Sequence, residues 1–137
     1  MTDDLSPTAS GSCLCGAVRY RTNAPLGPGF NACHCTQCRK QSGHHAAYVA
    51  AGRAADVTID GAGNVTWYRA SDTAKRGFCR ICGSQLFWVP DDGGTFDVSG
   101  GTLDEHPPIA LTGHIFVADK GAYYDIADGL PTYPQDS

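Results

Sequence analysis

The sequence contains no run of lysine or arginine residues and no long apolar segment. Its 137 residues include 10 basic and 14 acidic side chains, which give a formal net charge of -4 at pH 7. Affinity for a nucleic-acid backbone requires a clustered basic surface, so this pattern argues against a nucleic-acid partner. No apolar stretch approaches the roughly 20 residues that span a bilayer, so we expect no membrane role either.

A secretory signal is also missing from the start of the chain. Residues 1–12 are polar and acidic and lack the basic and apolar segments of such a signal. We therefore expect a cytoplasmic protein, in which thiols stay reduced. The chain has seven cysteines, and an odd number fits a disulfide framework poorly. Metal binding is the better interpretation of these cysteines.

The sequence lacks long windows of helical period, fixed-period repeats and low-complexity tracts. Short segments of strand character are instead separated by turn residues, a pattern typical of an all-β fold. We predict a flexible tail over residues 1–10 and a single domain over residues 11–137. Strands are expected over residues 17–22, 30–32, 46–51, 57–60, 65–69, 85–89, 95–99 and 109–117.

Three further features concern the connections. The segments 57–60 and 65–69 are expected to pair with each other around the turn 61–64. Residues 39–43 are expected to form one helical turn that ends at the glycine. Residues 123–134 are rich in aromatics and prolines, and we expect them to pack over the sheet as an irregular segment.

Three of the cysteines lie within six residues. Cys33, Cys35 and Cys38 have the spacing Cys-x-Cys-x-x-Cys, and a turn this tight can aim three sulfurs at one point. Zinc prefers four tetrahedral ligands, and thiolates are among its preferred donors. Three protein ligands with a vacant fourth position are typical of a reactive zinc. We therefore predict a catalytic zinc on this cysteine trio.

The other four cysteines form two distant pairs, Cys13 with Cys15 and Cys79 with Cys82. Together they make a complete four-thiolate set, typical of a closed structural zinc. A shared zinc would clamp the N-terminal strand to the middle of the chain. Structural zinc contributes roughly 10–16 kcal/mol in small finger peptides, compared with a net domain stability of about 5–15 kcal/mol. Loss of any of these four cysteines should therefore damage folding.

The histidines leave an alternative open for the trio. A second structural zinc could be completed by His34, His44 or His45, which are near in sequence. His34 lies between two ligands, so its ring is expected to point away from the metal. His44 or His45 is instead a candidate proton donor at the open position. His114 is expected to be a hydrogen-bonded core residue.

The residues after the trio are candidates for binding a ligand. Arg39 and Lys40 could pair with substrate carboxylates, because a planar guanidinium holds a carboxylate with two hydrogen bonds. Ordinary solvated charges are the equal alternative. Ser42 and Gly43 could hydrogen-bond to a ligand or simply end the turn.

The cysteine motifs and the end of the chain resemble those of the glutathione-dependent formaldehyde-activating (GFA) family. The matching segments are Gly11-Ser12-Cys13-Leu14-Cys15-Gly16, Cys33-His34-Cys35-Thr36-Gln37-Cys38-Arg39-Lys40, Phe78-Cys79-Arg80-Ile81-Cys82-Gly83-Ser84, and His114-Ile115 followed by Asp125-Ile126 and Asp128-Gly129-Leu130-Pro131. The resemblance covers nearly the whole chain, and all seven cysteines are in register. One departure is Ala122-Tyr123, where the family often has Pro-Trp.

This resemblance implies packed β-sheets of the Mss4-like type. It implies the same division of metals, with a structural zinc on the two pairs and a catalytic zinc on the trio. The activity that it implies is condensation of formaldehyde with glutathione to S-hydroxymethylglutathione, formally a carbon–sulfur lyase in reverse.

Three hypotheses about function follow. The first is a zinc-dependent carbon–sulfur lyase that acts on the adduct of a small thiol, such as glutathione, with an aldehyde; His44 or His45 would donate the proton and Arg39 would anchor the thiol's carboxylates. The second is a non-catalytic zinc module that binds a protein partner, because fold does not fix function. The third is metal buffering or thiol sensing by the trio. A sheet edge could also pair two subunits into a homodimer.

Overall fold

The computed structural model describes residues 8–136, which form ten β-strands, one α-helix and four short 3-10 helices. The strands are β1 (Ala9–Ser12), β2 (Arg19–Thr22), β3 (Phe30–Cys33), β4 (Ala46–Ala50), β5 (Val57–Asp60), β6 (Val65–Arg69), β7 (Ala74–Cys79), β8 (Gln85–Pro90), β9 (Asp97–Ser99) and β10 (Leu111–Ile115). The helix α1 is Thr36–Ser42, and the 3-10 helices are Ala54–Asp56, Ala62–Asn64, Gly100–Thr102 and Val117–Asp119. Within residues 8–136, no helix has the length and apolar character of a membrane span.

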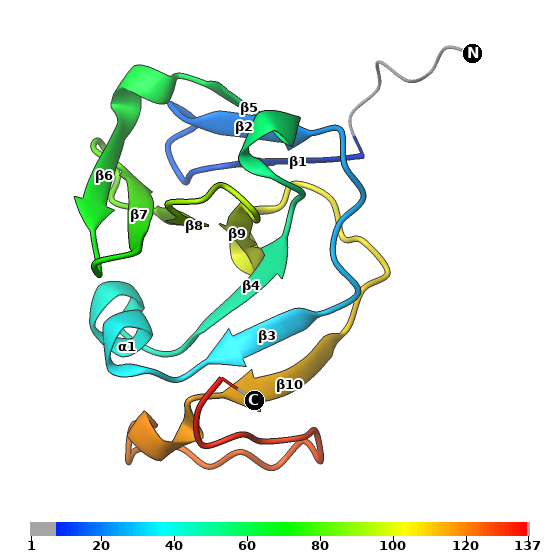
Figure 1. The fold of residues 1–137 in the computed structure, drawn as a ribbon, viewed down its shortest axis with the longest axis vertical. Helices are drawn as coiled ribbons and strands as arrows, with labels where there is room; N and C mark the ends of the chain where they lie inside the picture. The colour runs from blue at the N-terminus through cyan, green and yellow to red at the C-terminus, as the bar shows by residue number, and fades with distance from the viewer. Residues whose placement is uncertain (1–7, 137) are drawn as a thin grey trace.

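The strands form two sheets, which confirms the predicted packing of β-sheets (Figure 1). The smaller sheet has the order β1-β2-β5, and the larger has the order β10-β3-β4-β9-β8-β7-β6. Neighbouring strands are antiparallel, except that β10 runs parallel to β3. The segment after β10 is irregular and lies at the bottom of Figure 1. It returns alongside β10, where the His114 N–H donates to the Pro131 carbonyl over 2.9 Å.

One row of small and apolar residues, one from each of four adjacent strands of the larger sheet, faces the smaller sheet. Val49, Val98, Phe87 and Gly77 lie opposite one another on four adjacent strands. The ring of Phe87 meets Tyr20 of the smaller sheet edge-on, with centroids 5.3 Å apart. Val49, Val98 and Phe87 are all buried in the main core. Because side chains alternate along a strand, the next row of this sheet must point to the opposite face.

Gly77 allows two aromatic rings to stack across the strands. It lies between Trp67 on β6 and Phe87 on β8, whose rings stack with centroids 5.8 Å apart. A Cβ atom at position 77 would lie 2.9 Å from the Trp67 ring and 3.0 Å from the Phe87 ring. The absence of a side chain is therefore a packing requirement at this position.

The predicted pairing of the segments 57–60 and 65–69 is wrong. Both segments are strands, but β5 pairs with β2 and β6 pairs with β7. The turn between them begins at Gly61, with φ 79°, and carries the chain from one sheet to the other. Alternation predicts that a segment is a strand but does not name its partner, because every amphipathic edge offers the same backbone groups.

Other boundaries differ more modestly. Residues 1–7 of the predicted tail lie outside the described residues, whereas Ala9 and Ser10 belong to β1, because they pair with Thr22 and Arg21. The predicted helical turn is confirmed and begins earlier, at Thr36, because Cys35 caps it. It ends as predicted at Gly43, whose φ of 82° favours glycine.

Candidate functional site

The four-cysteine cluster joins the two sheets. Cys13 and Cys15 follow β1 of the smaller sheet, whereas Cys79 ends β7 of the larger one. The Sγ atoms of Cys13 and Cys15 are 3.7 Å apart, and those of Cys15 and Cys79 are 3.8 Å apart. All four sulfurs, including that of Cys82, lie within 4.8 Å of one another. Tetrahedral zinc with bonds of about 2.3 Å requires sulfurs about 3.8 Å apart, so the cluster fits this metal.

Backbone N–H groups point at these sulfurs. The Val18 N–H donates to Cys13 Sγ over 3.3 Å, and the Ile81 N–H donates to Cys79 Sγ over 3.4 Å. The Ser84 hydroxyl lies 3.2 Å from Cys82 Sγ, and hydrogen bonding to it lowers the pKa of Cys82 to about 5. Donors arranged in this way favour the thiolate form that zinc binds.

The cysteine trio is assembled by the end of one strand and the start of one helix. Cys33 ends β3, Cys35 is the N-cap of α1, and Cys38 lies in its first turn. The Cys35 Sγ accepts the Cys38 N–H over 3.3 Å, and the three sulfurs lie within 4.8 Å of one another. Hydrogen bonds from the sulfurs of Cys33 and Cys38 lower the pKa of Cys35 to about 2. The trio therefore offers three convergent donors, one of them strongly inclined to ionise, and it suits a zinc with a free fourth position.

The imidazole of His34 points away from the trio, as predicted. Its Nε2 lies 2.9 Å from Nδ1 of His114, and its Nδ1 lies 2.5 Å from the Tyr124 hydroxyl. His114 in turn contacts Asp128 through Nε2 at 2.7 Å. Burial lowers the pKa of His34 to about 4. Within residues 8–136, no histidine nitrogen joins the three sulfurs as a possible fourth ligand.

Arg76 is a site residue that the sequence analysis missed. It lies on β7 and is only 4% exposed, yet its guanidinium reaches the trio. Nη2 lies 3.4 Å from Cys38 Sγ, and Nη1 donates to Gln41 Oε1 over 2.8 Å and to the Tyr48 hydroxyl over 3.3 Å. A buried guanidinium beside a thiolate partly neutralises the charge of the sulfur group. The sequence shows only an arginine between Lys75 and Gly77, in a segment that was not predicted to be a strand, so nothing in its spacing marked it.

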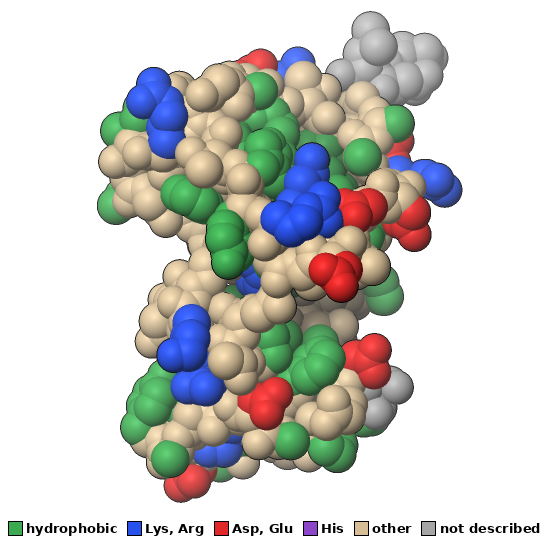
Figure 2. Space-filling model, turned by 60° about the vertical axis from the view of Figure 1, so that its left-hand side comes forward, with side chains coloured by type: hydrophobic (Ala, Val, Ile, Leu, Met, Phe, Trp, Pro, Cys, Tyr) green, Lys and Arg blue, Asp and Glu red, His purple; other side chains and the backbone are tan. Residues whose placement is uncertain are grey.

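A cavity of about 810 Å³ opens onto the trio. Besides the three cysteines, its wall includes Tyr48, Arg76, Trp88 and Asp97. On the face shown in Figure 2 the molecule narrows to a waist, and a basic side chain is visible deep within it. The cavity is large enough for a small peptide-sized ligand. A molecule bound there can reach the sulfurs directly.

The other predicted ligand-binding residues lie elsewhere. Among the described residues, the wall of the trio's cavity does not include Arg39, Ser42, Gly43 or His44. Ser42 accepts the His44 N–H over 3.1 Å and donates to the Cys38 carbonyl over 2.7 Å. His44 is exposed and hydrogen-bonded to Tyr123. The structure therefore shows Ser42 and Gly43 ending the helix.

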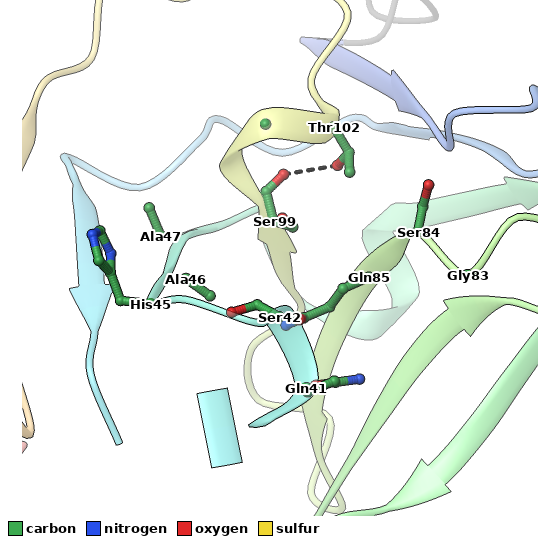
Figure 3. Close-up of a pocket in the computed structure, with 11 residues that line it drawn as sticks. Gln41, Ser42, His45, Ala46, Ala47, Gly83, Ser84, Gln85, Ser99 and Thr102 are labelled. Atoms are coloured by element: carbon green, nitrogen blue, oxygen red, sulfur yellow. Dashed lines mark hydrogen bonds between the residues drawn. The ribbon is translucent and has the colours of Figure 1, made fainter. Parts of the chain in front are cut away.

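Ser42 and His45 open onto a second cavity, of about 440 Å³ (Figure 3). Its walls come from the end of α1, the start of β4, the segment 83–85 and the segment 99–102. The Thr102 hydroxyl donates to the Ser99 carbonyl over 2.7 Å at its edge. The described lining contains no cysteine, so the predicted sulfur chemistry belongs to the larger cavity.

Comparison with known proteins agrees with this arrangement. Residues 8–119 match the family described as glutathione-dependent formaldehyde-activating enzyme. A Halomonas elongata protein that carries this family's name is 39% identical over 87 residues, which are 59% of this chain and 55% of that protein. An uncharacterised lyase of Schizosaccharomyces pombe is 24% identical over 131 residues, which are 95% of this chain and 93% of that protein.

A solved structure of a Rhodobacter sphaeroides protein is also similar. It superposes with a TM-score of 0.58 at 30% identity and covers 75% of this chain and 99% of that chain. The match to the Halomonas protein spans about half of that relative's length, whereas the family match extends from β1 to beyond β10. The chain therefore belongs to the glutathione-dependent formaldehyde-activating enzyme family.

Proposed function

We propose that this protein is a zinc-dependent carbon–sulfur lyase that forms or splits the adduct of a small thiol with an aldehyde, such as S-hydroxymethylglutathione. The observation that carries the proposal is the convergence of three cysteine sulfurs on the wall of an 810 Å³ cavity. A closed structural site would have no need of such a cavity. The family match and the lyase name of one relative support the same reaction class.

Two metal ions would have different roles. Cys13, Cys15, Cys79 and Cys82 would hold a structural zinc, and Cys33, Cys35 and Cys38 would hold a catalytic one. When bound at the trio, zinc supplies positive charge that favours the thiolate form of a thiol in the cavity. Arg76 would hold the Cys38 sulfur in place through its 3.4 Å contact.

The reaction forms one carbon–sulfur bond and moves one proton from the thiol to the carbonyl oxygen. The thiol loses its proton, its sulfur forms a bond to the aldehyde carbon, and the carbonyl oxygen takes up a proton as it becomes a hydroxyl. The reverse direction breaks the same carbon–sulfur bond. The wall of the cavity excludes part of the solvent, which strengthens the electrostatic interactions of the oxygen as it gains charge.

Two side chains are our candidates for the proton donor. His44 follows the trio in sequence, and it lies at the surface beside Tyr123. Tyr48 lines the cavity itself, and its hydroxyl accepts a hydrogen bond from Arg76. The variants His44→Gln and Tyr48→Phe separate these candidates, because the true donor's loss should reduce turnover about 100-fold or more.

The first test is zinc analysis of the whole chain combined with an assay of formaldehyde consumption in the presence of glutathione. We expect about two zinc ions per chain, a saturable rate with glutathione, and loss of that rate in Cys35→Ser. A protein that holds zinc at both clusters yet consumes no formaldehyde with any small thiol would contradict the proposal. It would favour the non-catalytic zinc module instead.

A further inference from the structure

A row of four side chains crosses the outer face of the larger sheet. Arg76, Trp88, Asp97 and Ala50 lie opposite one another on β7, β8, β9 and β4. They are the sequence neighbours of the core row, so alternation sends them to the other face. All four line the cavity that opens onto the cysteine trio. The row therefore presents a cation, an aromatic ring and a carboxylate in order along one wall.

The cation at one end of the row is already engaged. The guanidinium of Arg76 contacts Cys38 Sγ, Gln41 and Tyr48. The carboxylate of Asp97, on the third strand of the row, is not matched by a basic group. The Thr95 hydroxyl donates to Asp97 over 2.9 Å, and burial raises the pKa of Asp97 with only that hydroxyl to offset it. Asp97 therefore lacks a cationic partner within the described residues, although burial makes its charge costly.

The rest of the cavity reinforces this imbalance of charge. Asp119 and Asp136 also belong to its wall, whereas Arg76 is the one basic residue among the described lining residues. A ligand that carries a positive group would be favoured near Asp97.

Trp88 supplies the second half of a cation site. It is half-buried and lies directly opposite Asp97 on the neighbouring strand. Residues opposite each other on adjacent strands have side chains on the same face, with Cβ atoms about 4.5–5.5 Å apart. An indole ring beside a carboxylate binds an ammonium group by cation–π attraction together with an ion pair.

We propose that Asp97 and Trp88 bind the ammonium group of the thiol substrate, with Asp97 two strands away from Arg76 and Trp88 on the strand between them. This inference rests on the proposed function, which identifies the ligand as a thiol. Two strand spacings separate Arg76 from Asp97, which amounts to about 9–10 Å. A span of this order suits a peptide thiol whose ammonium group lies several bonds from its sulfur. A short aminothiol cannot occupy both ends at once.

The test compares glutathione with N-acetylglutathione, which lacks the ammonium group. Binding to the zinc-loaded full chain is measured by calorimetry, so that turnover is not required. We expect the wild-type protein to prefer glutathione by about tenfold or more, because a hydrogen bond to a charged group contributes about 1.5–3 kcal/mol. Asp97→Asn should abolish this preference, because it should weaken the binding of glutathione and leave the binding of N-acetylglutathione unchanged. Asp72→Asn removes an equal charge from an exposed turn outside the cavity and should keep the preference.

A second pair of variants, at Trp88, tests the proposal independently of whether Asp97→Asn folds. Trp88→Leu should reduce the preference for glutathione, and Trp88→Phe should restore part of it, because a phenyl ring retains some cation–π attraction. Melting curves of each variant verify that it is folded. An Asp97→Asn protein that still discriminates as the wild type does would overturn the proposal, as would a wild-type protein that binds both thiols equally or neither.

The outcomes for the two proposals can be told apart. If glutathione binds with a preference that depends on Asp97 but no formaldehyde is consumed, the reaction is wrong and the ammonium site stands. If formaldehyde is consumed and the preference survives in Asp97→Asn, the reaction stands and the ammonium site is wrong.

Discussion

The guanidinium of Arg76 lies 3.4 Å from the sulfur of Cys38, although the two residues are 38 positions apart in the chain. Arg76 projects from the middle of β7 and Cys38 lies in the first turn of α1. The contact ties β7, which lies next to the β6 edge of the larger sheet, to the cysteine trio. It gives Cys38, a proposed zinc ligand, a charged neighbour of the kind that tunes metal sites.

Replacing Arg76 should weaken zinc binding at the trio. Arg76→Met removes the charge beside Cys38 and leaves Gln41 and Tyr48 without their shared donor. We expect zinc affinity at the trio to fall about 10–100-fold, which is the usual effect of removing a residue that contacts a metal ligand. Competition with a coloured chelator measures it. Arg76→Lys keeps the charge but not the planar fork and should be intermediate. Zinc on the four-cysteine cluster is the internal reference, and equal retention at both sites would refute this role.

The two cysteine clusters should respond differently to mutation. Cys82→Ser removes a ligand from the cluster that joins the sheets, so we expect the folded state to be lost or its melting temperature to fall steeply. Cys35→Ser should leave a folded chain with about one zinc ion and no turnover. Elemental analysis and melting curves measure both effects. Unaltered thermal stability of Cys82→Ser would count against a structural role.

A methyl group at position 77 should destabilise the protein. In Gly77→Ala the new Cβ would lie 2.9 Å from Trp67 and 3.0 Å from Phe87, and overpacking of this kind costs about 1–3 kcal/mol. Gly63→Ala is the matched control, because no atom lies within 4 Å of its new Cβ. Denaturant unfolding compares the two variants. Equal stability of the two variants would show that the stacked rings of Trp67 and Phe87 can move apart without loss of stability.

The half-buried carboxylate of Asp97 should make stability depend on pH. Burial raises its pKa in the folded state above the ordinary value of 3.8, so the folded state holds the proton more tightly than the unfolded one. Its contribution to stability is therefore best below about pH 4 and declines as pH rises through the folded-state pKa. Asp97→Asn should be more stable than the wild type at pH 7 and equal to it near pH 3. Melting curves across this range test the sign, and a variant less stable at pH 7 would contradict it.

Local spacing carried much of the metal prediction. Cys33, Cys35 and Cys38 are so close in sequence that few backbone conformations separate their sulfurs, and the structure brings them together as predicted. Ligand number likewise assigned the two distant pairs to one cluster, because four thiolates complete a tetrahedral shell. Eight of the ten strands were also readable, since residues such as Tyr20 and Arg21 alternate between core and solvent as a period of two requires, whereas β1 and β7 were not predicted.

The fold was needed to establish which strands lie side by side. The partners of β5 and β6, and the parallel pairing of β10 with β3, depend on long connections and on sheet edges that look equivalent in the sequence. The row of Arg76, Trp88 and Asp97 depends on the same pairings, because each residue comes from a different strand. The amino-acid sequence was sufficient for features that depend on near neighbours in the chain, namely the cysteine trio and the faces of the strands. The wall of the cavity could not be predicted from the sequence, because these three side chains lie in one line only through the register of their strands.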